Sequence, residues 1–313
     1  MGTSVGVTLW QEDPEIARRA ISAVMAEMRR IDNSFSPYKP DSELSRVNRE
    51  AINSPVTISG ELMTIIDKAL YFSRASGGAF DISFASVGRH YDYRQGQQPS
   101  ENQREDLLAA IDYRLIELDK TSSTVSFKHP QLQIDLGGIA KGYAVDRGIA
   151  ILQQFDVTNA TVSAGGDSRV LGDRRGRPWV IGIKNPRGQS LAGDPSESED
   201  RVAIKLPLQD TAISTSGDYE RFFIDQNSGE RIHHILNPRT GKSVAGVTSV
   251  SILGPRGFDT DPLSTAVFVL GIERGLALVA SLSGFDAIVI DSAGKVHYSD
   301  GLTPPVTEVD QSP

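Results

Sequence analysis

Cysteine is absent from this chain of 313 residues. Its absence excludes disulfides, thiolate metal sites and cysteine nucleophiles, and it is compatible with export without requiring it. The sequence also has no apolar run long enough to span a membrane and no signal-peptide pattern before its first expected strand, 5–10. A start at Met1 followed directly by that strand fits a cytosolic protein, and it fits equally an exported protein trimmed of its signal.

Positive charge is scarce as well. The formal net charge is −8, and the longest basic run is the short stretch 173–177, so we do not expect nucleic acid as a partner. Hydrophobic residues make up 39% of the chain, which is enough apolar material to bury a sizeable core. The length suits one large domain built from two lobes. We therefore expect a single domain over 1–303 and a polar tail over 304–313.

Apolar spacing predicts helices and strands in mixed order, without an internal repeat. A helix begins at Asp13-Pro14, where an N-cap acid precedes a proline, and its apolar stripe continues to Ile31. Gly77-Gly78 ends a second helix. This mixture predicts the α+β class. The other expected elements are helices at 60–76 and 259–269, strands at 124–127, 132–135 and 248–253, a surface loop at 188–200, and a hairpin of 287–290 with 296–298.

The stretch 135–144, Asp-Leu-Gly-Gly-Ile-Ala-Lys-Gly-Tyr-Ala, is the most informative one, and we call it the glycine elbow. It joins the expected strand 132–135 to a helix whose apolar face starts at Val145. Paired glycines permit positive φ and close backbone approach, the first helix amides are free donors, and Lys141 adds a charge, so the elbow suits a phosphate. The alternative is an ordinary packing turn. The elbow matches neither the Walker pattern nor Gly-x-Gly-x-x-Gly.

Two oxygen-bearing side chains share one face of the expected helix 259–269. Asp261 and Thr265 lie four residues apart, so they project in the same direction. Such a pair suits Mg²⁺, which prefers oxygen, keeps several waters and completes its shell with substrate phosphate. The alternative is an acid near a helix N-terminus and a hydroxyl that bonds back to its own helix.

Two adjacent histidines close another expected strand. His233 and His234 alternate between opposite faces, so only one of them can enter a given site. Imidazole has an unperturbed pKa near neutrality, which suits proton transfer, although a strand histidine is otherwise structural. Tyr38 lies between Pro37 and Pro40 and is either a surface aromatic or a ring held ready to stack on a flat ligand.

Taken together, these turns resemble the FAD:protein FMN transferase family, known as ApbE. Eight motifs follow the family's order from residue 1 to about residue 271, and an ordered set is far more specific than any single motif. The matching segments are 1–4, 35–48, 77–82, 135–144, 164–167, 215–219, 234–241 and 261–265.

The resemblance implies mixed sheets and packed helices that form two lobes around a flavin cleft. It also implies an enzyme that breaks the pyrophosphate of FAD with Mg²⁺, joins FMN through a phosphoester to a threonine of an acceptor protein, and releases AMP. Relatives are exported and flavinylate redox-complex subunits at the outer face of the bacterial inner membrane. We therefore expect a periplasmic location and a flavoprotein partner, with membrane contact only through an anchor that the sequence does not show.

The resemblance also assigns residues to the reaction. His234 would take the proton of the threonine hydroxyl, and Asp218 is a second candidate for the base or its orienter. Lys141 would help to neutralise the phosphate oxygens. By the same resemblance, the metal ligands are the carbonyl oxygen of Ala140 and the side chains of Asp261, Ser264 and Thr265.

The flavin pocket follows from the resemblance alone. Tyr38 would stack on the isoalloxazine, and Asp81 would hydrogen-bond part of the nucleotide. Some relatives with another residue at the Tyr38 position hydrolyse FAD, so the tyrosine favours transfer. The full set of implied pocket residues is Met1, Tyr38, Ala79, Phe80, Asp81, Gly137, Tyr143 and Ile235.

Some positions depart from the family pattern. Asn237 replaces an aspartate, which leaves open how His234 is oriented, and Ser163 replaces an asparagine. Pro262 follows Asp261 where an alanine is commoner, and proline is tolerated in the first turn of a helix.

Two other functions stay open at this point. One is a hydrolase that uses the same pocket and splits FAD into FMN and AMP with water. The other is a non-catalytic flavin-binding protein. Glu43 and Asp167 are interpreted as a local cap and a turn former.

Overall fold

The computed structural model describes residues 2–188 and 202–302. Met1, the expected tail 304–313 and nearly all of the expected loop 188–200 lie outside the described residues. Within the described ranges, no helix is both long and apolar enough to cross a membrane.

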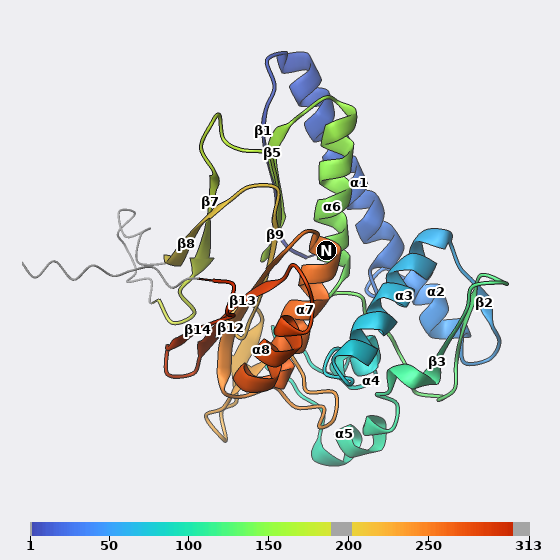
Figure 1. Cartoon of the computed structure of the whole chain (residues 1–313). Helices are drawn as coiled ribbons and strands as arrows, with labels where there is room; N and C mark the ends of the chain where they lie inside the picture. The colour runs from blue at the N-terminus through green and yellow to red at the C-terminus, as the bar shows by residue number, and fades with distance from the viewer. Residues whose placement is uncertain (1, 189–201, 303–313) are drawn as a thin grey trace, which may run out of the picture.

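A seven-stranded antiparallel sheet forms the first lobe (Figure 1). One of its inner strands, β12 (Val247–Gly254), is buried along its whole length. In spatial order the strands are β1 (Val5–Trp10), β5 (Asn159–Ala164), β6 (Asp167–Leu171), β9 (Ala212–Gly217), β12, β13 (Asp286–Asp291) and β14 (Val296–Tyr298).

Both faces of this sheet are covered. On one face, α6 (Ala140–Gln154) packs on β5 and β6, and α7 (Gly257–Leu270) packs on β9 and β12. α1 (Pro14–Phe35) lies outside α6, and α8 (Ile272–Ala280) lies outside α7. On the other face, the hairpin of β7 (Trp179–Lys184) and β8 (Val202–Leu208) closes a second apolar cluster.

The second lobe is smaller and mostly helical (Figure 1). Most of its buried apolar residues belong to the same core cluster as α6 and α7, so the two lobes share an interior, while Val87, Tyr91 and Leu107 around α4 and α5 form a separate small cluster. This arrangement confirms the α+β class and the two lobes. The lobe contains α2 (Glu43–Glu50), α3 (Gly60–Ala75), η1 (Ile82–Phe84), α4 (Ala85–Gly88), α5 (Glu101–Leu108), η2 (Tyr113–Leu115) and a small sheet of β2 (Val56–Thr57), β4 (Thr124–Phe127) and β3 (Ile116–Asp119).

Side-chain caps fix the starts of several helices, and the one at Asp13 is where the sequence predicts it. Asp13 accepts hydrogen bonds from the amides of residues 15 and 16, and Ser59 and Ser100 each cap the helix that follows. Glu43 accepts hydrogen bonds from the Ser59 amide and hydroxyl, so it holds the N-cap residue of α3 and is not the local cap that the sequence predicted.

The predicted strand at 132–135 is wrong. The segment is extended but pairs with no strand, because the side-chain amide of Asn48 takes the place of a neighbouring strand. Asn48 donates to the carbonyl of Ile134 at 2.9 Å and accepts from the Ile134 amide at 2.8 Å. The amide of Asp135 donates to Ile82. The elbow is therefore held by the second lobe rather than by the main sheet.

The predicted start of α7 is wrong by two residues. The helix begins at Gly257, so Pro262 lies in the second turn and not in the first. Proline has no amide hydrogen, so the carbonyl of Phe258 loses its helical donor there. The helix nevertheless continues to Leu270, since nearly all of its residues are buried against β9, β12 and α6.

The crossing of α6 and α7 requires glycine. A Cβ on Gly142 would lie 2.0 Å from the carbonyl oxygen of Gly257. We expect Gly142→Ala to lower the free energy of unfolding by about 3 kcal/mol, because backbone blocks the added methyl. Urea denaturation measures the change. Gly60→Ala is the matched control, since nothing lies within 4 Å of its added carbon; an equal loss in both variants would contradict the close crossing.

Candidate active site

The first turns of α6 and α7 cap each other. Neither helix has a side-chain bond from its own N-cap residue. Asp146 of α6 instead accepts hydrogen bonds from the amides of Gly257 and Phe258, both at 2.9 Å. Asp261 of α7 accepts from the amide of Gly142 at 2.9 Å. Asp261 therefore serves the neighbouring helix, and this reciprocal capping fixes its carboxylate at the glycine elbow.

Lys141 lies between two buried carboxylates. Its Nζ is 2.9 Å from Asp167 and 3.0 Å from Asp261, and it donates to the carbonyl of Gly137 at 3.0 Å. Asp167 and Asp261 are 1% and 2% exposed. Burial, and then the negative charge of Asp167, raises the pKa of Asp261 above its ordinary value. The two carboxylates and the ammonium of Lys141 together carry one formal negative charge.

A row of hydroxyls joins α7 to β9 beside the carboxylate pair. Ser214 and Ser216 share one face of β9, and their hydroxyls lie 2.8 Å from those of Thr260 and Ser264, which are one helical turn apart. The hydroxyl of Ser216 is also 3.3 Å from that of Thr265. The spacing of alternate residues on β9 matches one turn of α7. These contacts therefore hold the hydroxyls of Ser264 and Thr265, which are the two predicted to bind the metal. Ser264 donates in addition to the carbonyl at position 261 of its own helix.

The elbow glycines are needed for close approach and not for positive φ. Neither Gly137 nor Gly138 has a positive φ, which corrects that part of the expectation. A Cβ on Gly138 would lie 3.1 Å from the ring of Phe80 and 3.5 Å from the hydroxyl of Thr265. The elbow backbone therefore passes between the second lobe and α7, and it brings Ala140 to the start of α6 beside Lys141.

Several groups that the sequence predicted to bind an anion at the elbow are engaged within the chain. The amide of Ala140 donates to the carbonyl of Leu136, the amide of Gly142 donates to Asp261, and the charge of Lys141 is already paired with acids. That these helix amides and Lys141 bind phosphate directly stays a prediction, and in this arrangement the chain's own acids and carbonyls bind them. The excess of buried oxygen atoms at the elbow suits a cation.

The donor set fits a divalent cation with oxygen ligands. Oδ2 of Asp167 is buried without a hydrogen bond, although the ammonium of Lys141 lies at 2.9 Å. The hydroxyls of Ser264 and Thr265 lie on the same helix as Asp261. Among the described residues, no group of three or more His, Asp or Glu side chains has metal-binding geometry. Hydroxyl and main-chain oxygens would therefore complete the shell, as Mg²⁺ tolerates.

The two histidines face different surroundings, as their alternation predicts. His233 is buried, and its Nε2 lies 2.7 Å from the carbonyl of Val244 while its ring meets Phe268 edge-on. In His234, by contrast, Nδ1 is buried and has no hydrogen-bond partner in the part of the chain that the structure describes. A buried polar atom without a partner is costly. His233 is therefore structural, and His234 is available to a ligand.

His234 is neutral across the physiological range. Burial, followed by the positive charge of Arg221, lowers its pKa to about 3. The ordinary imidazole pKa near neutrality suggested a proton-transfer role for His234, but burial of the ring lowers that pKa. A neutral imidazole with a free nitrogen can still accept a proton from a hydroxyl placed against it.

Asp218 is engaged elsewhere. Both of its oxygens are bound by the guanidinium of Arg187, at 2.6 and 2.8 Å. The structure does not bring Asp218 to His234 by a hydrogen bond. Asn237 does not orient that ring either, because its Oδ1 accepts from the amide of Arg239. The role of Asp218 as base or orienter stays a prediction.

The expected flavin residues differ in exposure. Ala79, Phe80 and Ile235 are buried, whereas the Tyr38 side chain is 83% exposed on its loop. Tyr38 is within electrostatic reach of Asp135 at the elbow. A ring exposed in this way costs nothing in packing and is free to stack on a ligand.

Asp81 has a structural role in this arrangement. One oxygen accepts from the amide and hydroxyl of Ser83, and the other accepts from the amide of Tyr113. Burial raises the pKa of Asp81 to about 6. Its expected contact with the nucleotide stays a prediction, since the chain's own donors already occupy both oxygens.

This raised pKa predicts a pH dependence of stability. Folded Asp81 binds its proton more tightly than the unfolded chain does, so its contribution is greatest below pH 4 and is lost as the pH rises to about 6. Relative to Asp81→Asn, the native chain is expected to lose about 3 kcal/mol in free energy of unfolding between pH 3.5 and pH 7. Urea titrations of both proteins measure this difference. A constant difference would contradict the raised pKa.

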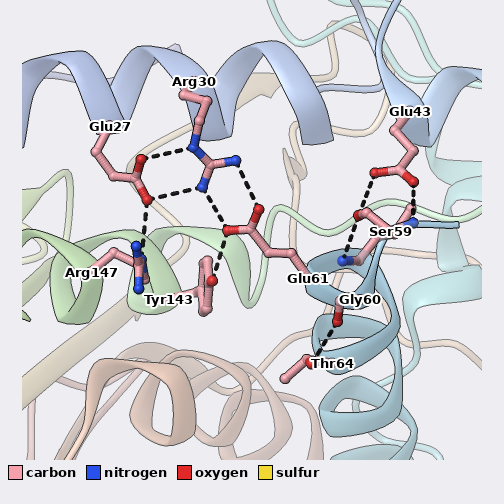
Figure 2. A network of polar contacts seen from close by, with 10 residues as sticks. Glu27, Arg30, Glu43, Ser59, Gly60, Glu61, Thr64, Tyr143 and Arg147 are labelled. Atoms are coloured by element: carbon pink, nitrogen blue, oxygen red, sulfur yellow. Dashed lines mark hydrogen bonds and ion pairs between the residues drawn. The ribbon is translucent and has the colours of Figure 1, made fainter.

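Tyr143 binds between helices rather than at the acids of the elbow (Figure 2). Its hydroxyl donates to Glu61 of α3 at 2.7 Å. Glu61 also pairs with Arg30 of α1, which binds Glu27 in turn. This network joins α1, α3 and α6, so it fastens the second lobe to the first. The assignment of Tyr143 to the flavin pocket stays a prediction.

Two cavities lie away from the elbow. One of about 600 Å³ is bounded by Gln97, Glu101 and Asp225, between α5 and the two-stranded β10 (Phe222–Ile224) and β11 (Arg231–His233). The other, about 150 Å³, lies beside Arg187 and β12. Neither is lined by an elbow residue, so the flavin cleft between the lobes stays a prediction.

Asp167 is the site residue that sequence reasoning interpreted wrongly. It was expected to form a turn, but it starts β6 and pairs with Lys141. The motif 164–167 contained the signal, since an acid placed directly after a strand and two glycines repeats the pattern found at 77–81. Ser216 is a second missed residue, and it lies within the motif 215–219.

Comparisons with known proteins identify the family of this chain. The sequence pattern of the ApbE family matches residues 1–289. The FAD:protein FMN transferase of Treponema pallidum (strain Nichols) is 30% identical, over 99% of this chain and 88% of its own. A crystal structure of an ApbE protein from Thermotoga maritima superimposes with a TM-score of 0.85 at 34% identity, covering 96% of this chain and 94% of its own.

A second solved structure, the flavin transferase ApbE from Vibrio cholerae, gives a TM-score of 0.80 at 27% identity, with the same 96% and 94% coverage. The matched range includes β6, the elbow, β9 and α7. Because the likeness extends through both lobes and through every element that builds the site, this chain belongs to the ApbE family.

Proposed function

We propose that this protein is an FAD:protein FMN transferase that moves FMN from FAD to a threonine hydroxyl of an acceptor protein and releases AMP. Relatives named for this activity support the proposal. The observation that carries it is the buried Asp167–Lys141–Asp261 group beside the hydroxyls of α7, within electrostatic reach of an unpartnered His234 nitrogen.

Asp261, Thr265 and the carbonyl oxygen of Ala140 would hold Mg²⁺, with Ser264 and Asp167 beside them. When bound, the ion neutralises charge on the phosphate oxygens and favours departure of the AMP group. Lys141 keeps the two carboxylates together, because without its charge two buried acids would repel each other. Its role is therefore to hold the site rather than to touch the phosphate.

His234 would accept the proton of the threonine hydroxyl. The threonine oxygen then forms a bond to the FMN phosphorus, the bond from that phosphorus to the bridging oxygen breaks, and the electron pair leaves with AMP. Positioning accounts for most of the acceleration in such transfers. The unpartnered Nδ1 of His234 fits a residue that gains its hydrogen-bond partner only when the acceptor arrives.

We propose a periplasmic location and an acceptor that is a flavoprotein subunit of a redox complex. Fractionation of cells that produce the full-length protein tests the first point. Mass spectrometry of the acceptor tests the choice of acceptor and the transfer activity together. Incubation with FAD, Mg²⁺ and the acceptor should add the mass of one FMN to the acceptor. Release of AMP without that gain would indicate hydrolysis, and unchanged FAD would indicate binding alone.

Tyr38→Ser is expected to weaken FAD binding and to divert turnover toward free FMN. Loss of a stacked ring costs about 0.5–1.5 kcal/mol, or roughly 2- to 10-fold in affinity. Because the side chain is exposed, the melting temperature should not change. Flavin fluorescence measures the affinity, and chromatography measures the ratio of free to protein-bound FMN. An unchanged affinity and ratio would remove Tyr38 from the pocket.

A further inference from the structure

The pyrophosphate of FAD carries two negative charges, and the arrangement at the elbow leaves open which side chain meets them. Lys141 is bound to Asp167 and Asp261, and His234 is neutral. A bound Mg²⁺ would offset the residual negative charge of the carboxylates as well as that of the substrate. A further cation facing the elbow is therefore needed to balance the charge of the bound dinucleotide.

Arg221 stands at this position. It directly precedes β10, and its carbonyl accepts the His234 amide at 3.1 Å, so its backbone lies beside the histidine. Its side chain points toward the beginning of the chain, where Nη2 lies 3.6 Å from the Cβ position of Gly2. Its charge acts on Asp135 of the elbow and on Tyr38. Arg221 therefore faces the elbow, the exposed ring and the histidine together.

The guanidinium of Arg221 is also unused. It is exposed, and among the described residues it makes no side-chain hydrogen bond and no ion pair within 4 Å. Two nearby arginines are engaged elsewhere: Arg187 is bound by Asp218, and the guanidinium of Arg231 lies over the ring of Phe222. Arginine binds phosphate through two parallel hydrogen bonds, and it keeps its charge at every physiological pH.

We propose that Arg221 is a substrate-binding residue that pairs with the pyrophosphate of FAD and aligns it against the acids of the elbow. The proposal rests on the transferase function proposed above. It assigns the anion-binding role that the elbow sequence suggested for Lys141 to a residue from the other side of the site. In this arrangement Lys141 holds the carboxylates, and Arg221 holds the substrate.

The test measures the Kd of FAD by flavin fluorescence in the presence of Mg²⁺, for the native chain and for three variants. Arg221→Gln is expected to raise the Kd about 10- to 100-fold, since it removes a charge-assisted pair. Arg221→Lys should recover part of this loss. Arg18→Gln is the control, because it removes another exposed arginine, one that pairs with Glu15 on α1, and it should stay within about twofold of the native value.

Riboflavin, which has no phosphate, serves as a competing ligand. Its inhibition constant should change less than about twofold in Arg221→Gln, since the arginine acts on phosphate alone. An unchanged Kd for FAD in Arg221→Gln would overturn the proposal, and so would an equal loss for riboflavin. Failure of the native chain to bind FAD would instead overturn the transferase function on which the proposal rests. Unchanged melting temperatures exclude misfolding as the cause.

Discussion

Replacing Asp261 by asparagine is expected to lower FMN transfer by roughly 10³-fold or more, while FAD binding weakens much less. The carboxylate is the charged oxygen ligand that α7 presents to the elbow, and it also holds Lys141 and the amide of Gly142. An amide in its place offers no charge to a cation. AMP release measured with FAD and Mg²⁺ reports turnover, and fluorescence titration reports binding.

Asp259 offers a matched control on the same helix. It is equally buried, but it pairs with Lys68 and Arg256 on another side of α7. Asp259→Asn should lower stability and leave turnover within a few-fold of the native rate. If Asp259→Asn lost as much activity as Asp261→Asn, the loss would reflect damage to α7. Transfer by Asp261→Asn that persists in excess EDTA would end the metal assignment.

His234→Ala is expected to slow transfer by about 10²- to 10⁴-fold, the usual contribution of a positioned base. Its Nδ1 is buried and lacks a hydrogen-bond partner among the described residues, so it is left for the acceptor hydroxyl. His233→Gln is the control, because His233 binds Val244 and packs on Phe268. That variant should lose stability and keep most of its rate per folded molecule. Equal rate losses in the two variants would argue against a specific role for His234.

The pH profile separates two accounts of this histidine. With a pKa lowered to about 3, the ring is already neutral at pH 5, so His234 should not produce a limb between pH 5 and 8. A histidine of ordinary pKa would give a limb near 6.5. Single-turnover rates at saturating FAD measure the profile. A limb near 6.5 that disappears in His234→Gln would contradict the effect of burial on the ring.

Local signals in the sequence predicted the parts of the site that depend on spacing. The four-residue interval of Asp261 and Thr265 placed both on one helix, and the alternation of His233 and His234 separated their roles. These rules depend only on the periods of helix and strand. The elbow was found in the same way, since a glycine pair before a helical stripe is a local feature.

Contacts between distant segments escaped sequence reasoning. Asp167 meets Lys141 only because β6 packs beside α6. Asn48 takes the place of a strand partner for Ile134, which lies 86 positions further along the chain. Lys141 was predicted at the elbow from the sequence, but its pairing with Asp167 was not. A single sequence gives the charge of a side chain, whereas the fold decides which opposite charge it meets.

Diffraction from a crystal soaked with FAD and Mn²⁺, a stand-in for Mg²⁺ with a strong anomalous signal, tests the central claim most directly. We predict one anomalous peak within about 2.5 Å of the Asp261 carboxylate, the Thr265 hydroxyl and the Ala140 carbonyl, in contact with the pyrophosphate. A peak elsewhere, or FAD bound with its phosphates away from the elbow and no metal beside Asp261, would contradict the account.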